Sequence, residues 1–173
     1  MGTRAWIFLI LFLIAGIPFF LKIKPPLRNI SPVVRSFYDA IDSLPEGSSI
    51  LLSFDYGPSA MPELHPMATA IIEHAFRKKL KVISIALWPD GHPFSRDLVK
   101  TAAQKAGKEY GSDYVTLGYM PGLSAVVIGI GDDIRKTFPA DADKRPTQDL
   151  PILAENTNYQ KIGLVVCLAA GAT

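Results

Sequence analysis

Apolar and polar positions alternate along residues 31–171 in two patterns that repeat down the chain. Short apolar runs bounded by glycine, proline or polar residues are typical of strands buried on both faces of a sheet. Stretches with an apolar residue at every third or fourth position are typical of helices that bury one face. We predict strands over residues 48–54, 81–88, 113–119 and 162–171. We predict helices over residues 32–44, 66–79, 95–110 and 122–138.

The order of these elements predicts an α/β fold. Buried strands that alternate with amphipathic helices favour a parallel sheet, since parallel strands need a crossover connection. We therefore expect a Rossmann-like three-layer domain with a mainly parallel sheet of about four strands. The segment 122–138 contains β-branched residues that also suit a strand, but its apolar positions fit one helical face better. Residues 139–161 are polar and are expected to include one short helix.

The most apolar stretch is residues 5–21, which contain no charged side chain. At roughly 1.5 Å per residue a helix of this length reaches about 25 Å, close to the roughly 30 Å hydrocarbon core of a bilayer. Lys22 can snorkel and extend the span. We predict a single transmembrane helix that serves as an uncleaved signal-anchor. A cleaved signal peptide and a buried core helix are the alternatives.

Basic residues flank this stretch unequally. Arg4 precedes it, whereas Lys22, Lys24 and Arg28 follow it. Because the more basic flank stays cytoplasmic, we expect a single-pass membrane protein whose larger domain faces the cytoplasm. The expected partners are the lipid bilayer, through residues 5–21, and a further membrane protein.

The same flanks account for the positive net charge of +2. Four of the 18 basic residues and none of the 16 acidic ones lie in residues 1–28, so the remainder carries a net charge of −2. A mildly acidic domain argues against nucleic-acid binding. The mean hydropathy of +0.22 excludes a disordered chain. The single cysteine excludes a disulfide framework and a cysteine-based zinc site.

Three segments follow from these observations. Residues 1–24 form the anchor with its flanks, residues 25–30 form a linker that begins Pro25-Pro26, and residues 31–173 form the α/β domain. Thr173 follows almost directly after the last predicted strand, where a loop and a further helix are usual. Either this strand ends the sheet or the chain is a fragment, and we favour the fragment.

The polar segments that follow the predicted strands form the candidate ligand site. In parallel α/β sheets, ligands bind beyond the carboxyl ends of the strands, and these ends share one edge of the sheet. The fourth predicted strand ends at Gly171. The candidate ligand-binding residues are Asp55, Tyr56, Gly57, Ser59, Asp90, Gly91, Tyr119 and Gly122.

Asp55, Asp90 and His92 are the candidate catalytic residues, because carboxylates and imidazole serve in acid–base chemistry or as ligands of a divalent metal. No spacing among them matches a metal motif, so we assign no metal. Asp55 and Asp90 also occupy positions where Asp commonly shapes a turn. The sequence contains no P-loop and no G-x-S-x-G motif. Cys167, inside the last apolar strand, is expected to be a buried, inert thiol.

Three functions remain open. The first is a membrane-anchored α/β domain that binds a small ligand at the carboxyl ends of its strands. The second is a non-catalytic structural or interaction subunit of a membrane complex. The third is a hydrolase that uses Asp55, Asp90 and His92. The residues identify no cofactor and leave open whether the protein is an enzyme.

Overall fold

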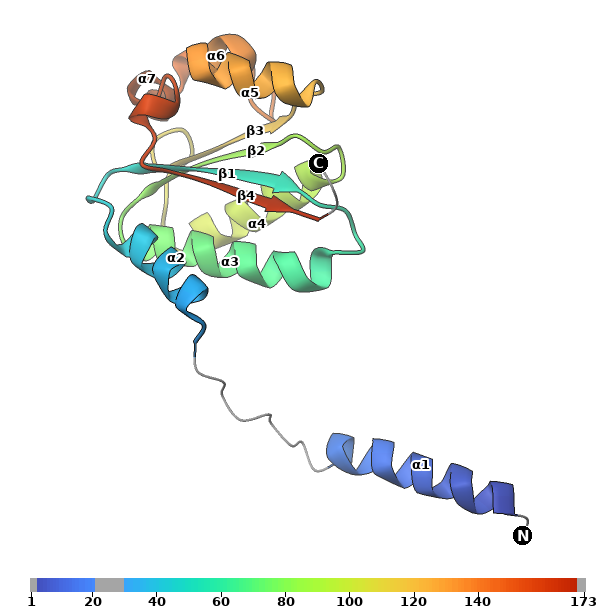
Figure 1. Ribbon diagram of the computed structural model, residues 1–173. Coiled ribbons are helices and arrows are strands. Elements are labelled where there is room, and N and C mark those ends of the chain that lie inside the picture. The colour runs from blue at the N-terminus through green and yellow to red at the C-terminus, as the bar shows by residue number, and fades with distance from the viewer. Residues whose placement is uncertain (1–2, 21–29, 171–173) are drawn as a thin grey trace. The chain divides into compact units, whose positions relative to one another are not determined.

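The structure, a computed structural model, describes residues 3–20 and 30–170 (Figure 1). The chain divides into two compact units, Met1–Arg35 and Ser36–Thr173, and each is described by itself. Of the predicted linker 25–30, only residue 30 lies within the described residues. Gly171, the predicted end of the last strand, lies outside them.

The first unit contains helix α1 (Thr3–Phe20). Arg4 lies in its first turn, so the uncharged part of the helix, residues 5–20, reaches about 24 Å at 1.5 Å per residue. Within residues 3–20 and 30–170, no helix has both the length and the hydropathy that crossing a bilayer requires. This finding contradicts the predicted transmembrane helix, and with it the signal-anchor and the single-pass localisation with a cytoplasmic domain. Contact of residues 5–21 with lipid, or with a membrane protein, stays a prediction.

The second unit is built on a parallel four-stranded sheet, as the sequence pattern predicts. The strands lie in the order β3-β2-β1-β4, so the chain steps outward from β1 and then returns to its other side. All three pairings are parallel, and Ser53 of β1 lies between Ile85 of β2 and Cys167 of β4. The strands are β1 (Ser49–Asp55), β2 (Lys81–Ala86), β3 (Tyr114–Tyr119) and β4 (Leu164–Ala169).

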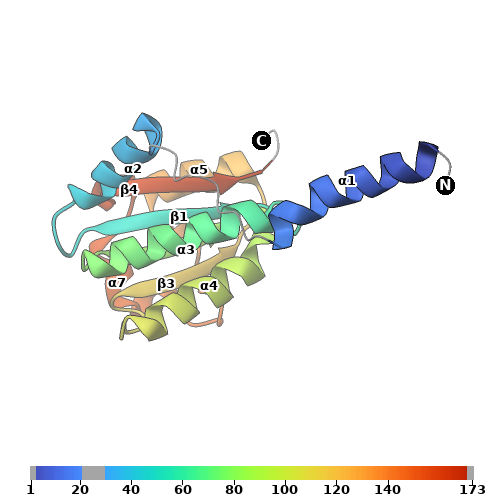
Figure 2. The ribbon, with the colours of Figure 1, turned by 90° about the horizontal axis from the view of Figure 1, so that it is seen from below.

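Helices cover both faces of the sheet, which gives the expected three layers. Helices α2, α3 and α4 lie below the sheet in Figure 1, whereas α5, α6 and α7 lie above it. Figure 2 shows α3 and α4 side by side across the lower face. The helices are α2 (Pro32–Asp42), α3 (Met61–Arg77), α4 (Gly91–Lys105), α5 (Leu123–Asp132), α6 (Ile134–Thr137) and α7 (Pro151–Glu155), with short 3-10 turns η1 (Thr147–Asp149) and η2 (Tyr159–Lys161).

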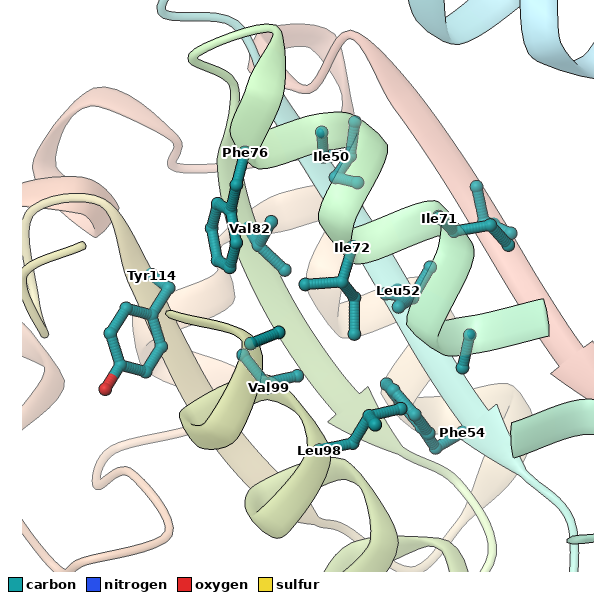
Figure 3. Close-up of a cluster of buried hydrophobic side chains, with 14 of the residues drawn as sticks. Ile50, Leu52, Phe54, Ile71, Ile72, Phe76, Val82, Leu98, Val99 and Tyr114 are labelled. Atoms are coloured by element: carbon teal, nitrogen blue, oxygen red, sulfur yellow. The ribbon is translucent and has the colours of Figure 1, made fainter. Parts of the chain in front are cut away.

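Alternation along each strand divides the apolar residues between two cores. The lower core lies between the sheet and α3 and α4 (Figure 3). Its labelled members are Ile50, Leu52, Phe54, Ile71, Ile72, Phe76, Val82, Leu98, Val99 and Tyr114. The upper core lies under α5 and α6. Its largest fully buried members are Leu51, Ile83, Ile130, Ile134 and Phe138.

Two helices begin earlier than their sequence suggests. Helix α3 starts at Met61 instead of residue 66. Pro62 lies in its first turn, where proline is tolerated, and Pro66 is accommodated inside the helix. Helix α4 starts at Gly91 instead of residue 95. Ser95 therefore lies inside the helix, where its hydroxyl donates to the carbonyl of His92. The segment 122–138 is helical, as preferred, but it breaks at Asp133 into α5 and α6.

Candidate functional site

A pocket of about 580 Å³ opens at the carboxyl ends of β1, β2 and β3. We call it the crest pocket. Asp55 is the last residue of β1, and residues 87–90 form the loop from β2 to α4. Tyr119 ends β3, and residues 120–122 connect it to Leu123, the first residue of α5. Its lining residues are Asp55, Leu87, Trp88, Pro89, Asp90, Tyr119, Gly122 and Leu123. Segments distant in sequence therefore meet at one edge of the sheet, as the parallel topology predicts.

Asp55 joins β1 and β4 to the loop after β2 at this edge. Its side chain is buried, and its Oδ1 accepts a hydrogen bond of 2.7 Å from the backbone N–H of Leu87. Its Oδ2 accepts hydrogen bonds from the Ser53 hydroxyl, at 2.6 Å, and from the Cys167 thiol, at 3.2 Å. Both carboxylate oxygens are thus occupied by protein donors. Asp55 fixes the floor of the pocket and its negative charge rather than presenting a free carboxylate.

The Asp55–Cys167 contact lies where the strand order reverses, between β1 and β4. In open α/β sheets this switch point commonly receives the ligand. Here the thiol contact and a hydrogen bond from the Ala170 N–H to the Asp55 carbonyl join the two strands. The crest pocket does not lie at this switch point but at the ends of β1, β2 and β3.

Cys167 is exposed rather than buried, because β4 is an edge strand whose upper face is open. Partial burial, the hydrogen bond to Asp55 and the negative charge of Asp55 together raise the pKa of the thiol to about 11. At neutral pH the sulfur is therefore protonated and a poor nucleophile. The predicted inertness agrees with this pKa, but the predicted burial is wrong.

Asp90 supplies the second carboxylate of the pocket. It precedes α4 but does not cap that helix with its side chain. A Cβ atom placed on Gly57 would lie 3.3 Å from the Asp90 Oδ2, so this carboxylate reaches across to the loop after β1. Asp90 is exposed, and no hydrogen bond to its side chain forms within the described residues. It is the carboxylate that a ligand can reach.

Gly91 is required by close packing. Helix α4 lies so close to β1 here that a Cβ atom at position 91 would be 1.7 Å from the carbonyl oxygen of Phe54. Glycine alone lets the helix approach the strand this closely. This contact sets the position of the loop 87–90, and hence of Asp90, over the end of β1.

Apolar side chains form the outer wall of the crest pocket. Trp88 is 52% exposed, Leu123 44% and Tyr119 38%, which is unusual for large side chains that line one hollow. Helix α5 begins at the same wall, where Gly122 has a φ of 98° and no side chain caps the helix. The first backbone N–H groups of a helix have no intrahelical acceptor. The pocket thus combines an apolar wall with a hydrogen-bond acceptor, the Asp90 carboxylate, and hydrogen-bond donors, the first N–H groups of α5.

Four predicted ligand-binding residues do not line the crest pocket: Gly91, which packs against β1 instead, and Tyr56, Gly57 and Ser59. Tyr56 follows Asp55 and therefore points to the lower core, where it is fully buried and stacks on Phe94 at 5.7 Å. Its hydroxyl lies 3.2 Å from His65 Nδ1, and burial raises its pKa to about 12. Ser59 is exposed in the following loop, outside the lining. Gly57 is likewise outside the lining but adjoins Asp90.

Of the three candidate catalytic residues, Asp55 and Asp90 both line the crest pocket, but His92 does not. Asp55 points to the upper face, with Ser53 and Cys167. His92 belongs to α4 on the lower face, and its ring lies next to Gly118 of β3. In the part of the chain that the structure describes, no three His, Cys, Asp or Glu side chains are grouped to hold a metal ion. The hydrolase hypothesis therefore has no assembled acid–base pair to support it.

Leu87, Trp88 and Leu123 line the crest pocket but were not predicted. Leu87 and Trp88 form the end of the apolar run 81–88, which was predicted to be strand throughout. The strand ends at Ala86, and the last two residues enter the loop. A tryptophan directly before Pro-Asp-Gly is a sequence signal that could have identified this wall.

Searches against protein-family models, curated proteins and solved structures find no match to this chain. Its function is therefore argued from the geometry of the site.

Proposed function

We propose that the α/β domain binds a small, uncharged or cationic ligand with a planar body in the crest pocket. One observation carries this proposal: a hollow of about 580 Å³ at the strand ends, with Trp88 and Tyr119 on its wall and Asp90 within reach. Small-molecule sites are typically hollows of this size, mostly apolar, with a few polar groups that orient the ligand.

The charges on the wall define the ligand class. Among the described residues that line the pocket, two are aspartates and none is lysine, arginine or histidine. A phosphate or carboxylate would face two negative charges there, with no cation to offset them. Hydroxyl and amino groups, in contrast, can donate hydrogen bonds to Asp90. The start of α5 can in turn donate backbone hydrogen bonds to a carbonyl or ring nitrogen.

The exposed indole supports a planar ligand. An aromatic pair contributes roughly 0.5–1.5 kcal/mol beyond its buried area. Trp88 and Leu123 already lie at the pocket, so a ring placed against them covers apolar surface that otherwise faces water. Nucleosides and nucleobases combine a planar ring with donors and acceptors, and they are the first compounds to test.

A thermal-shift panel on the full chain tests this proposal. The panel contains nucleosides, nucleobases and free sugars, each beside its phosphorylated form. A ligand at 100 times its Kd stabilises a protein by about 2.7 kcal/mol, which for a domain of this size raises Tm by roughly 5–10 °C. We expect a shift with an uncharged planar compound and a smaller shift, or none, with its phosphorylated form.

Two matched variants locate the binding. Asp90→Asn removes the reachable carboxylate charge and should weaken binding about tenfold, the effect of losing one charged hydrogen bond of roughly 1.5 kcal/mol. Asp97→Asn makes the same change on an exposed position of α4 outside the pocket and should have no effect. Equal affinity in both variants would refute the assignment to the crest pocket. The absence of any shift across the panel would refute the ligand class.

A further inference from the structure

A second pocket, of about 190 Å³, lies against β3 and α4, away from the crest pocket. Strand β3 is at the edge of the sheet, and the loop 140–146 runs along it, where the Ala142 N–H donates to the Thr116 carbonyl. We call this the edge pocket. Its lining residues are Arg96, Lys100, Tyr110, Tyr114, Thr116, Ala142, Asp143 and Arg145.

The loop that forms one wall is fixed by Asp141. This buried carboxylate accepts the N–H groups of Asp143 and Arg145 through Oδ1, both at 2.8 Å. Its Oδ2 accepts the Tyr110 hydroxyl at 2.7 Å. The Arg145 guanidinium lies 4.6 Å from the centre of the Tyr110 ring, a cation–π distance. Arg145 is therefore held beside the pocket, with its side chain still open to solvent.

Positive charge dominates the edge pocket. Arg96, Lys100 and Arg145 contribute three cations, and Asp143 is the one acidic residue among the lining residues. Asp143 contacts both arginines and so offsets one charge. No ion pair between described residues involves Lys100. The lining therefore retains a net charge of +2, reduced to +1 by the buried Asp141 behind it.

Two hydroxyl groups add uncharged donors. Thr116 is buried, and its Oγ1 accepts the Ser84 hydroxyl at 3.0 Å, which leaves its own proton free to donate. The Tyr114 ring packs at the margin of the lower core, edge-on to Phe76, and its hydroxyl points away from the apolar cluster (Figure 3). Donors thus surround the cavity without a matching set of acceptors.

We propose that the edge pocket binds the phosphate group of a small ligand. A phosphate group brings negative charge to a lining that keeps uncompensated positive charge, and arginine donors match its oxygens in geometry. The cavity is several times the roughly 30 Å³ that one water occupies in the liquid, which leaves room for a tetrahedral oxyanion. The site is separate from the crest pocket, whose carboxylates disfavour the same group.

Calorimetric titration of the full chain at low ionic strength tests this proposal. One arm uses inorganic phosphate and the other uses glycerol phosphate, a phosphate monoester. We expect saturable binding in the millimolar range or below, weakened by added salt because the pocket is open to solvent. Tighter binding of the monoester supports a phosphorylated organic ligand, and equal binding supports the free ion. No saturable binding in either arm overturns the proposal.

Lys100→Gln and Arg145→Gln locate the site. Each should weaken phosphate binding about fivefold, the effect of losing an exposed ion pair of roughly 1 kcal/mol. Lys100 is exposed and forms no ion pair with a described residue, so its replacement should leave Tm unchanged and separates loss of binding from loss of folding. Arg77→Gln, an equivalent change on the exposed surface of α3, is the control. Binding that is unchanged in both pocket variants overturns the assignment, whatever the crest pocket binds.

Discussion

Replacement of Gly91 by alanine probes the contact that positions the crest pocket. The added Cβ would lie 1.7 Å from the carbonyl oxygen of Phe54 and 2.8 Å from its carbonyl carbon. A carbon and an oxygen in close contact are about 3.3 Å apart, so the start of α4 must move away from β1 by roughly 1.6 Å. Both atoms that the methyl group meets belong to the backbone, and neither can rotate away.

The cost of this change follows from the packing. Overpacking a core typically costs about 1–3 kcal/mol. We expect Gly91→Ala to reach the upper end of that range, because helix α4 carries Leu98 and Val99 into the lower core and a shift disturbs both. For a domain of this size, a loss of about 3 kcal/mol lowers Tm by roughly 10 °C. Urea unfolding followed by far-UV circular dichroism measures the loss.

Gly131→Ala is the matched control. Gly131 lies inside α5, and a Cβ there would lie 3.7 Å from the Tyr159 ring, an ordinary contact. Since alanine favours a helix over glycine, this variant should gain about 0.5–1 kcal/mol. The two substitutions are chemically identical and should change stability in opposite directions. A Gly91→Ala protein as stable as the parent would refute the close approach of α4 to β1.

Three further predictions concern the Asp55–Cys167 contact and a buried hydroxyl beside the upper core. Asp55→Asn removes the negative charge that helps raise the pKa of Cys167, so this thiol should alkylate at lower pH. An unchanged pH profile would argue against the contact. The folded protein holds the thiol proton more tightly than the unfolded chain, whose thiol has a pKa of about 9. The free energy of unfolding should therefore fall as the pH rises from about 9 to about 11, by more in the parent than in Cys167→Ser. Thr147→Val deletes a buried hydroxyl that donates to the Phe138 carbonyl at 2.6 Å, and urea unfolding should show a loss of about 1–3 kcal/mol.

Most of the secondary structure was predictable from the hydrophobic pattern. Each predicted strand lies within about two residues of the observed one, because apolar runs between turn residues leave few alternatives. The start of α3 was not predictable in this way, since Pro66 usually marks a helix start and here lies inside the helix. The N-terminal stretch is a helix, but Arg4 falls within it, and its predicted role as a membrane span is contradicted.

The location of the candidate site at the strand ends was predictable, but the orientation and contacts of its side chains were not. Parallel topology brings Asp55, Asp90, Tyr119 and Gly122 to one pocket, as expected from their positions after the strands. Simple alternation along β1 could have shown that Tyr56 points away from Asp55. The separation of Asp55 from His92 by the sheet depends on which face α4 covers, and the sequence does not specify that face. The contact of Asp55 with Cys167 depends on β4 pairing with β1, which no local pattern reveals.

The indole N–H signal of Trp88 in a two-dimensional NMR spectrum tests the central proposal most directly. The chain has two tryptophans, so a Trp6→Phe variant of the full chain leaves Trp88 as the single indole signal. Titration with the planar compound that gives the largest thermal shift should move this signal until it saturates, and Asp90→Asn should shift the midpoint to about tenfold higher concentration. A signal that stays fixed while the compound still stabilises the protein would place binding elsewhere and contradict the assignment of the crest pocket.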